Sequence, residues 1–208
     1  MNEGNRIPLW VKLAYTAFMT VLVPVYWANY GPANFLYFCD IALFFALVAV
    51  WKEDSLLASI PAVGIFFPQM LWCVDFTTGF FGYSPLGMTG YMFEPERSLL
   101  LRGLSLFHGW LPFLLLWMVM RLGYDRRAFK AWWAISWAAM LVAYSCLPAE
   151  KDPDAPLLPY NINYVFGLEE RQTWMAEWQW LAIMLIAIPL VLALPSHLLF
   201  QRTVRRVA

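Results

Sequence analysis

The sequence carries little charge. Lys, Arg, Asp and Glu make up 13% of its 208 residues, about half of the roughly 25% that soluble domains contain. Motifs are also scarce: we find no internal repeat, low-complexity tract or nucleotide-binding glycine motif. The only two histidines, His108 and His197, lie near opposite ends of their runs, and no Cys/His spacing typical of a metal site is present. We therefore expect no metal and no cofactor.

The missing charge is replaced by six long apolar runs, at about 9–29, 34–51, 56–81, 98–121, 129–148 and 173–199. Each approaches or exceeds the roughly 20 residues that a helix needs to cross a bilayer. The sequence predicts an all-α, polytopic membrane protein, with six transmembrane helices in one bundle and residues 1–208 forming one domain. The first run is too long for the core of a signal peptide, so no cleavable leader is expected.

The few charges are unevenly distributed between the loops. If the N-terminus is cytoplasmic, ten basic residues lie inside: Arg6, Lys12, Lys52, Arg121, Arg126, Arg127, Lys130, Arg202, Arg205 and Arg206. Four lie outside: Arg97, Arg102, Lys151 and Arg171. The positive-inside rule then predicts that both termini are cytoplasmic. We expect a multi-pass protein of the cell membrane, most simply a bacterial inner membrane.

Ionisable side chains occur inside several predicted spans, where they are costly and usually functional. The stretch "NFLYFCDIALFF" places Cys39 beside Asp40 in the second span, Asp75 lies in the third, and His108 lies in the fourth. A rise of 1.5 Å per residue places all four at a similar depth, in the outer half of the membrane. Pro112 has no N–H for the His108 carbonyl, which predicts irregular helix beside this histidine.

Neighbouring polar residues extend this cluster. Ser105 shares a helix face with His108, and Trp72 lies one turn from Asp75 on the third span. Asp75 is equally consistent with a structural carboxyl and with a pocket acid. Cys39 and Cys73 lie at similar depths, so a disulfide between them is conceivable.

The last outer loop contains "LPYNINYVFGL", which is apolar and aromatic but too short to span. We expect it to pack back on the bundle as a lid or re-entrant segment. Asn163 could donate an amide hydrogen bond to an oxyanion, whereas Asn161 is better explained by turn capping.

Three blocks, "FLYFCDIALFF", "LSLFHGWLPF" and "NINYVFGL", together with six spans, resemble the YwaF-like family of bacterial membrane proteins. The wider group includes a eukaryotic ether-phospholipid acyltransferase and the androgen-induced hydrolases of fatty-acid esters of hydroxy fatty acids. The resemblance to the acyltransferase branch implies that Cys39 and His108 are the functional pair. The hydrolase branch uses a threonine nucleophile, which "FCDIA" lacks.

These observations favour a membrane enzyme that hydrolyses or transfers acyl groups of lipids. Cys39 would be the nucleophile and His108 its base, with Asp40 or Asp75 orienting the imidazole. The expected substrate contacts are Asp75, Ser105, Asn163 and Trp72. A membrane lipid is the expected partner, and no nucleic acid is expected.

The sequence is also compatible with two other functions. One is a non-catalytic protein that binds a lipid or small molecule. The other is a proton-coupled transporter with Asp40, Asp75 and His108 as its relay, which the lack of inverted-repeat signs disfavours.

Overall fold

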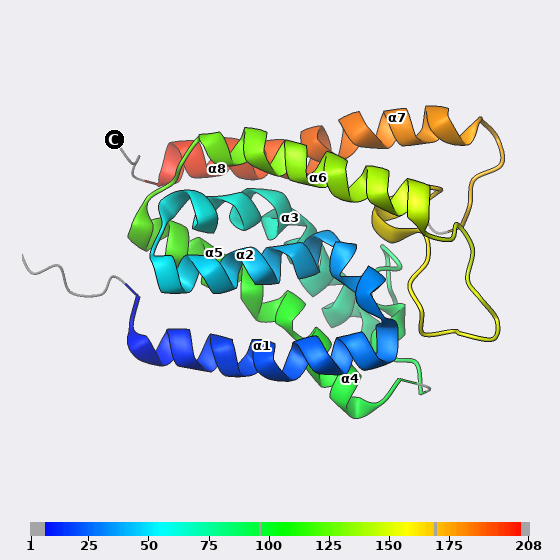
Figure 1. Cartoon of the computed structure of the whole chain (residues 1–208), viewed down its shortest axis with the longest axis horizontal. Coiled ribbons are helices and arrows are strands. Elements are labelled where there is room, and N and C mark those ends of the chain that lie inside the picture. The colour runs from blue at the N-terminus through cyan, green and yellow to red at the C-terminus, as the bar shows by residue number, and fades with distance from the viewer. Residues whose placement is uncertain (1–6, 96, 169, 205–208) are drawn as a thin grey trace, which may run out of the picture.

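The computed structural model describes residues 7–95, 97–168 and 170–204, and within these all regular secondary structure is helical. The main helices lie side by side along one long axis (Figure 1). Helix α1 begins, and helix α8 ends, at the same end of this bundle. The predicted all-α architecture is therefore confirmed.

Four helical segments are long and apolar enough to cross a membrane. They are α1 (Leu9–Tyr30), α3 (Ser55–Gly79), α4 and α5 taken together (Leu99–Leu122), and the segment Glu177–Thr203. The last consists of α7 (Glu177–Ile188), a π-helical stretch η4 (Pro189–Ala193) and α8 (Leu194–Thr203). The structure is thus that of a membrane-embedded helical protein.

The other two expected spans are helices of a different kind. Helix α2 (Phe38–Lys52) has 15 residues, fewer than the roughly 20 that cross a bilayer. Helix α6 (Arg127–Cys146) has 20 residues but is less apolar. Both run alongside the long helices in Figure 1.

Helix α2 begins four residues later than the sequence predicts. Residues Pro32–Leu36 form a short 3₁₀ helix, η1. Tyr37 is extended (φ −59°, ψ 139°) and separates η1 from α2. Asn34 lies within η1, and its side chain donates a hydrogen bond to Asp40.

The fourth expected span is interrupted beside His108, as predicted. Helix α4 (Leu99–Ser105) ends and α5 (Phe107–Leu122) begins on either side of Leu106. Cys73 on α3 contacts the carbonyl oxygen of His108, which Pro112 leaves without its helical partner, with an S···O distance of 3.9 Å. The irregular backbone is therefore packed against a neighbouring helix, as membrane interiors require.

Helix α3 is the centre of the bundle and packs against α2, α5 and α6. Gly64 is needed at the contact with α6, because a Cβ atom there would lie 2.0 Å from the ring of Trp132. Trp132 itself is 1% exposed. The helices therefore approach closely at a small residue, as is common between membrane helices.

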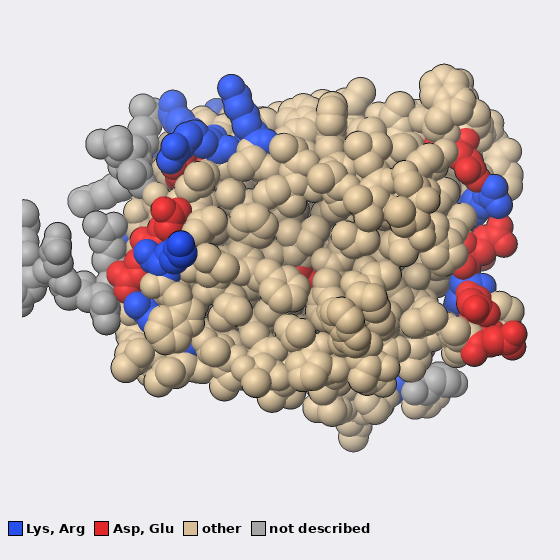
Figure 2. Space-filling model, viewed as in Figure 1, with Lys and Arg blue, Asp and Glu red and all other residues tan. Residues whose placement is uncertain are grey.

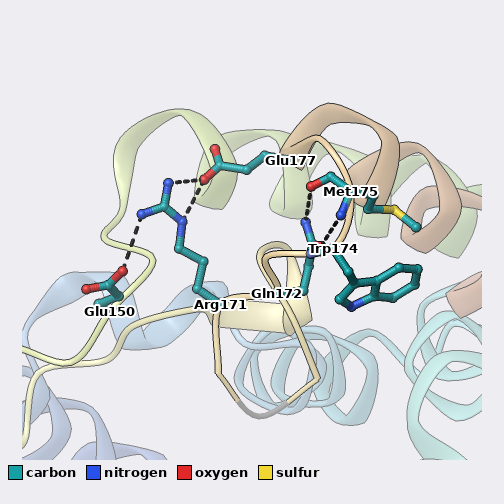
Figure 3. A network of polar contacts seen from close by, with 6 residues as sticks. All are labelled: Glu150, Arg171, Gln172, Trp174, Met175 and Glu177. Carbon is teal, nitrogen blue, oxygen red and sulfur yellow. Dashed lines mark hydrogen bonds and ion pairs between the residues drawn. The ribbon is translucent and has the colours of Figure 1, made fainter.

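Charged side chains gather at the two ends of the long axis, and the face between them in Figure 2 is almost free of them. One end carries the ion pairs Lys12–Glu53 (2.7 Å) and Asp125–Arg127 (2.7 Å). At the other end, Arg171 joins Glu150 and Glu177 (Figure 3). This distribution matches that of a protein whose middle lies in hydrocarbon.

Side-chain hydrogen bonds order the last loop just before α7 begins. Figure 3 shows Gln172, whose Nε2 donates to the Met175 carbonyl (3.0 Å) and whose Oε1 accepts from the amides of Trp174 and Met175. Further back in this loop, the turn η3 (Ile162–Tyr164) buries Ile162 and Asn163. The segment therefore packs on the bundle, as predicted.

Candidate functional site

A cavity of about 530 Å³ lies at the end of the bundle where α6 gives way to the last loop. Its walls come from α1, from η1 and the start of α2, from α4 and α5, and from the loops around residues 86–94 and 151–168. Five residues singled out in the sequence line it: Cys39, Asp40, Ser105, His108 and Asn163. The other two, Trp72 and Asp75, lie outside its lining.

The imidazole of His108 is held by backbone and by aromatic rings. Its Nδ1 lies 2.8 Å from the carbonyl oxygen of Ser105. A carbonyl oxygen can only accept, so Nδ1 carries the hydrogen and Nε2 of the neutral ring keeps its lone pair. The ring stacks on Trp72 and on Phe107, with centroid distances of 5.1 and 4.0 Å.

This arrangement corrects one expectation. We expected Asp40 or Asp75 to orient the imidazole, but the Ser105 carbonyl occupies the Nδ1 position instead. The cause is the break at Leu106, because Ser105 is the last residue of α4. The interruption turns its carbonyl toward the ring of His108.

Asp40 is buried in the first turn of α2 and is only half-satisfied. Its Oδ2 accepts a hydrogen bond of 2.8 Å from Asn34 Nδ2. Its Oδ1 has no partner among the described residues, although the side chain is 2% exposed. An acidic side chain in this turn is favoured by the positive end of the helix dipole.

Asn163 anchors the last loop to the start of α2. Its Oδ1 accepts from the Phe38 amide (3.2 Å), and its Nδ2 donates to the Leu36 carbonyl (2.9 Å). It adopts the left-handed conformation (φ 57°), as do Asn161 and Tyr164. The amide that we expected to meet an oxyanion is therefore hydrogen-bonded to the backbone of the two residues Leu36 and Phe38, which precede Cys39.

Asn161 caps the turn of the same loop, as predicted. Its Nδ2 donates to the Gly167 carbonyl and its Oδ1 accepts from the Phe166 amide. Three left-handed non-glycine residues in one short segment store backbone strain, which surrounding hydrogen bonds must offset.

Asp75 holds the loop that forms another wall of the cavity. Its carboxylate, which is fully buried, accepts from Ser84 Oγ, from the Leu86 amide, and from both the amide and the hydroxyl of Thr89, at 2.8–2.9 Å. Of the two roles that the sequence left open, this geometry matches the structural one.

Trp72 supports the site from outside the cavity. Its ring stacks on His108, and its Nε1 donates to the hydroxyl of Tyr91 (3.2 Å) in the same loop that Asp75 holds. Burial raises the pKa of Tyr91, which lines the cavity and therefore keeps its proton. Trp72 thus links the histidine to the wall.

All three cysteines are free thiols, so Cys39 and Cys73 form no disulfide. Cys39 lies in the first turn of α2 and is half-buried in the cavity wall. Cys146 is exposed at the end of α6. Of the three, only Cys39 lines the cavity.

Sequence reasoning missed the tyrosines. Six of the lining residues are Tyr26, Tyr30, Tyr37, Tyr91, Tyr160 and Tyr164. A hydrogen bond of 2.8 Å joins Tyr26 to Ser105, and Arg97 contacts the rings of Tyr30 and Tyr91. Their signal in the sequence was weak, because tyrosines near span ends are expected as interfacial residues.

Comparison with other proteins adds no assignment: no family model, curated protein or solved structure matches this chain.

Proposed function

We propose that the protein is a membrane enzyme of lipid acyl chemistry, in which Cys39 attacks an ester and His108 is its base. One observation carries the proposal: the two residues line a single cavity, and the hydrogen bond to Ser105 leaves His108 Nε2 as a proton acceptor. A thiol needs such a base to become a nucleophile. The apolar bundle around the cavity suits a substrate with acyl chains.

The proposed reaction is redox-neutral and needs no cofactor. The Cys39 proton moves to Nε2, and the sulfur forms a bond to the carbonyl carbon. The tetrahedral intermediate then breaks its C–O bond, and the alcohol leaves with the proton from Nε2. Water or a second alcohol cleaves the thioester in the same way, which gives hydrolysis or acyl transfer.

The membrane setting is part of the proposal. We propose that α2 and α6 complete six spans, with both termini cytoplasmic in a multi-pass cell-membrane protein. Support comes from the parallel course of these helices and from the basic side chains at the end where α1 begins. The cavity would then open near the outer leaflet.

The test is acylation of the purified full-length protein by p-nitrophenyl octanoate, with the modified residue identified by mass spectrometry. We expect a thioester on Cys39, lost in Cys39→Ser and slowed about 100-fold or more in His108→Ala. Cys146→Ser is the matched control and should react as the parent does, because its thiol lies outside the cavity.

Acylation of Cys146 alone, or a His108→Ala variant that reacts as fast as the parent, would contradict the proposal. The cavity would then be better described as a non-catalytic site for a lipid or small molecule.

A further inference from the structure

The first turn of α2 contains donors that the proposed reaction has not used. The first backbone N–H groups of an α-helix have no partner within the helix. In α2 the Phe38 amide is satisfied by Asn163 Oδ1. In the part of the chain that the structure describes, the amides of Cys39 and Asp40 have no oxygen acceptor, and both are directed at the Cys39 thiol. Both residues line the cavity.

A second observation at the same turn points to a ligand. Asp40 Oδ1 has no partner in the described chain, and the side chain is 2% exposed. Protonation does not resolve this, because a proton on Oδ1 would turn an unsatisfied acceptor into an unsatisfied donor. A buried polar atom left in this state costs about 1–3 kcal/mol. A hydroxyl group of a bound molecule would supply the missing partner.

We infer that the first turn of α2 binds the reacting acyl group, with the amides of Cys39 and Asp40 donating to its carbonyl oxygen and Asp40 Oδ1 accepting from the hydroxyl of the free alcohol, which is the leaving product or the attacking acceptor. This inference rests on the proposed acyl chemistry and assigns the donor role that Asn163 does not fill. It also makes an alcohol, and not only water, the partner of the acyl group.

The geometry fits the flow of charge in the reaction. When sulfur bonds to the carbonyl carbon, the π electron pair moves onto the oxygen, and negative charge develops beside two N–H donors at the positive end of a helix. When that pair returns, the C–O bond breaks. The alcohol takes its proton from His108 Nε2, and once it is free it can donate this one hydrogen to Asp40 Oδ1.

Proline substitution separates the Asp40 amide from its side chain. Asp40→Ala removes the carboxylate and keeps the N–H, whereas Asp40→Pro removes both, and proline is tolerated in the first turn of a helix. For each variant we compare the rate of Cys39 acylation by p-nitrophenyl octanoate with its rate of alkylation by iodoacetamide. Alkylation forms no oxyanion, so the ratio of the two rates corrects for changes in thiol reactivity.

We expect this ratio to be about 100-fold lower in Asp40→Pro than in Asp40→Ala, the usual effect of removing one oxyanion donor. Equal ratios would overturn the inference while leaving Cys39 acylation intact. A parent protein that is never acylated on Cys39 would overturn the proposed function as well. If Asp40→Pro does not fold, an ester bond in place of the Cys39–Asp40 peptide removes the same hydrogen, and the same fall is expected.

The carboxylate has its own test. The octanoyl thioester on Cys39 is treated with 1-octanol or with hydroxylamine, a nucleophile strong enough to react without Asp40. The hydrogen bond to Oδ1 holds the alcohol before its proton moves to His108 Nε2, so we expect the octanol concentration that half-saturates deacylation to be about tenfold higher in Asp40→Ala, the loss of a typical hydrogen bond to a charged group. The hydroxylamine rates should be equal. An unchanged half-saturating octanol concentration would overturn the role given to Oδ1.

Discussion

The start of α2 and the end of α3 each bury an aspartate near the cavity, and the fold uses the two carboxylates differently. Asp75 accepts four hydrogen bonds from the loop at 84–89 and lies outside the cavity lining. Asp40 accepts one, from Asn34, and lies in the lining. A fully satisfied carboxylate holds its surroundings together, whereas a half-satisfied one retains capacity for a ligand.

Replacing each aspartate by asparagine tests this contrast and should give the largest difference. Asp75→Asn puts an amide where four donors converge, so we expect the free energy of unfolding to fall by about 3 kcal/mol. Asp40→Asn should change it by less than about 1 kcal/mol, because only one hydrogen bond is affected. Thermal unfolding in detergent measures both, with exposed Asp152→Asn as the control.

A similar loss of stability in both variants would remove the distinction between a structural and a ligand-binding carboxylate.

Gln69 on α3 is a third buried polar side chain, and its effect on the free energy of unfolding can be compared with those of Asp75 and Asp40. Both atoms of its amide are buried without a partner among the described residues, and it lies outside the cavity. With no ligand to satisfy it, Gln69→Met should stabilise the protein, by about 1–2 kcal/mol. Gln172→Met is the matched control and should destabilise, since both the nitrogen and the oxygen of that amide are hydrogen-bonded. A destabilised Gln69→Met would indicate that an unrecognised partner serves the amide.

The smallest effect is expected at the opposite end of the bundle. Hydrogen bonds from Arg127 lower the pKa of Asp125 below its usual value, so this carboxylate binds its proton less readily in the folded state. Its stabilising contribution is complete above the unfolded pKa of about 3.9 and is lost as pH falls through the lower folded value.

Below about pH 4, therefore, Asp125→Asn should lose less stability than the parent does on acidification. Unfolding followed between pH 3 and pH 7 measures this. The difference should be small because the Arg127 side chain is 77% exposed and the pair is screened by water. An identical pH dependence in the two proteins would show that the pair contributes nothing.

Much of the fold follows from the sequence, because long apolar runs leave little choice but helices. The same holds for the gathering of Cys39, Asp40, Ser105 and His108, since depth along a helix follows from residue counting. Pro112 also predicted irregular backbone beside His108, although not that the helix would break at Leu106. These inferences depend only on local spacing.

What the sequence does not show is how side chains are directed between elements. In the sequence, Asp75 and Asp40 look alike, since each is an aspartate inside an apolar run. Asp75 obtains its four hydrogen bonds only because the loop at 84–89 folds over it. The bond from His108 to the Ser105 carbonyl depends on a helix break at Leu106 that no residue type marks. Nor does the sequence show that the buried amide of Gln69 lacks a partner among the described residues.

The hydrogen bonds of the Asn163 side chain determine when, during synthesis, the surroundings of Cys39 can form. This side chain joins the loop before α7 to Leu36, 127 residues earlier in the chain, and the Tyr164 carbonyl beside it accepts from Trp180 on α7. A ribosome delivers α2 long before either residue, so the nascent chain carries Cys39 into the membrane with its surroundings unfinished. The surroundings of Cys39 become complete only when α7 arrives, so their assembly lags far behind the synthesis of α2.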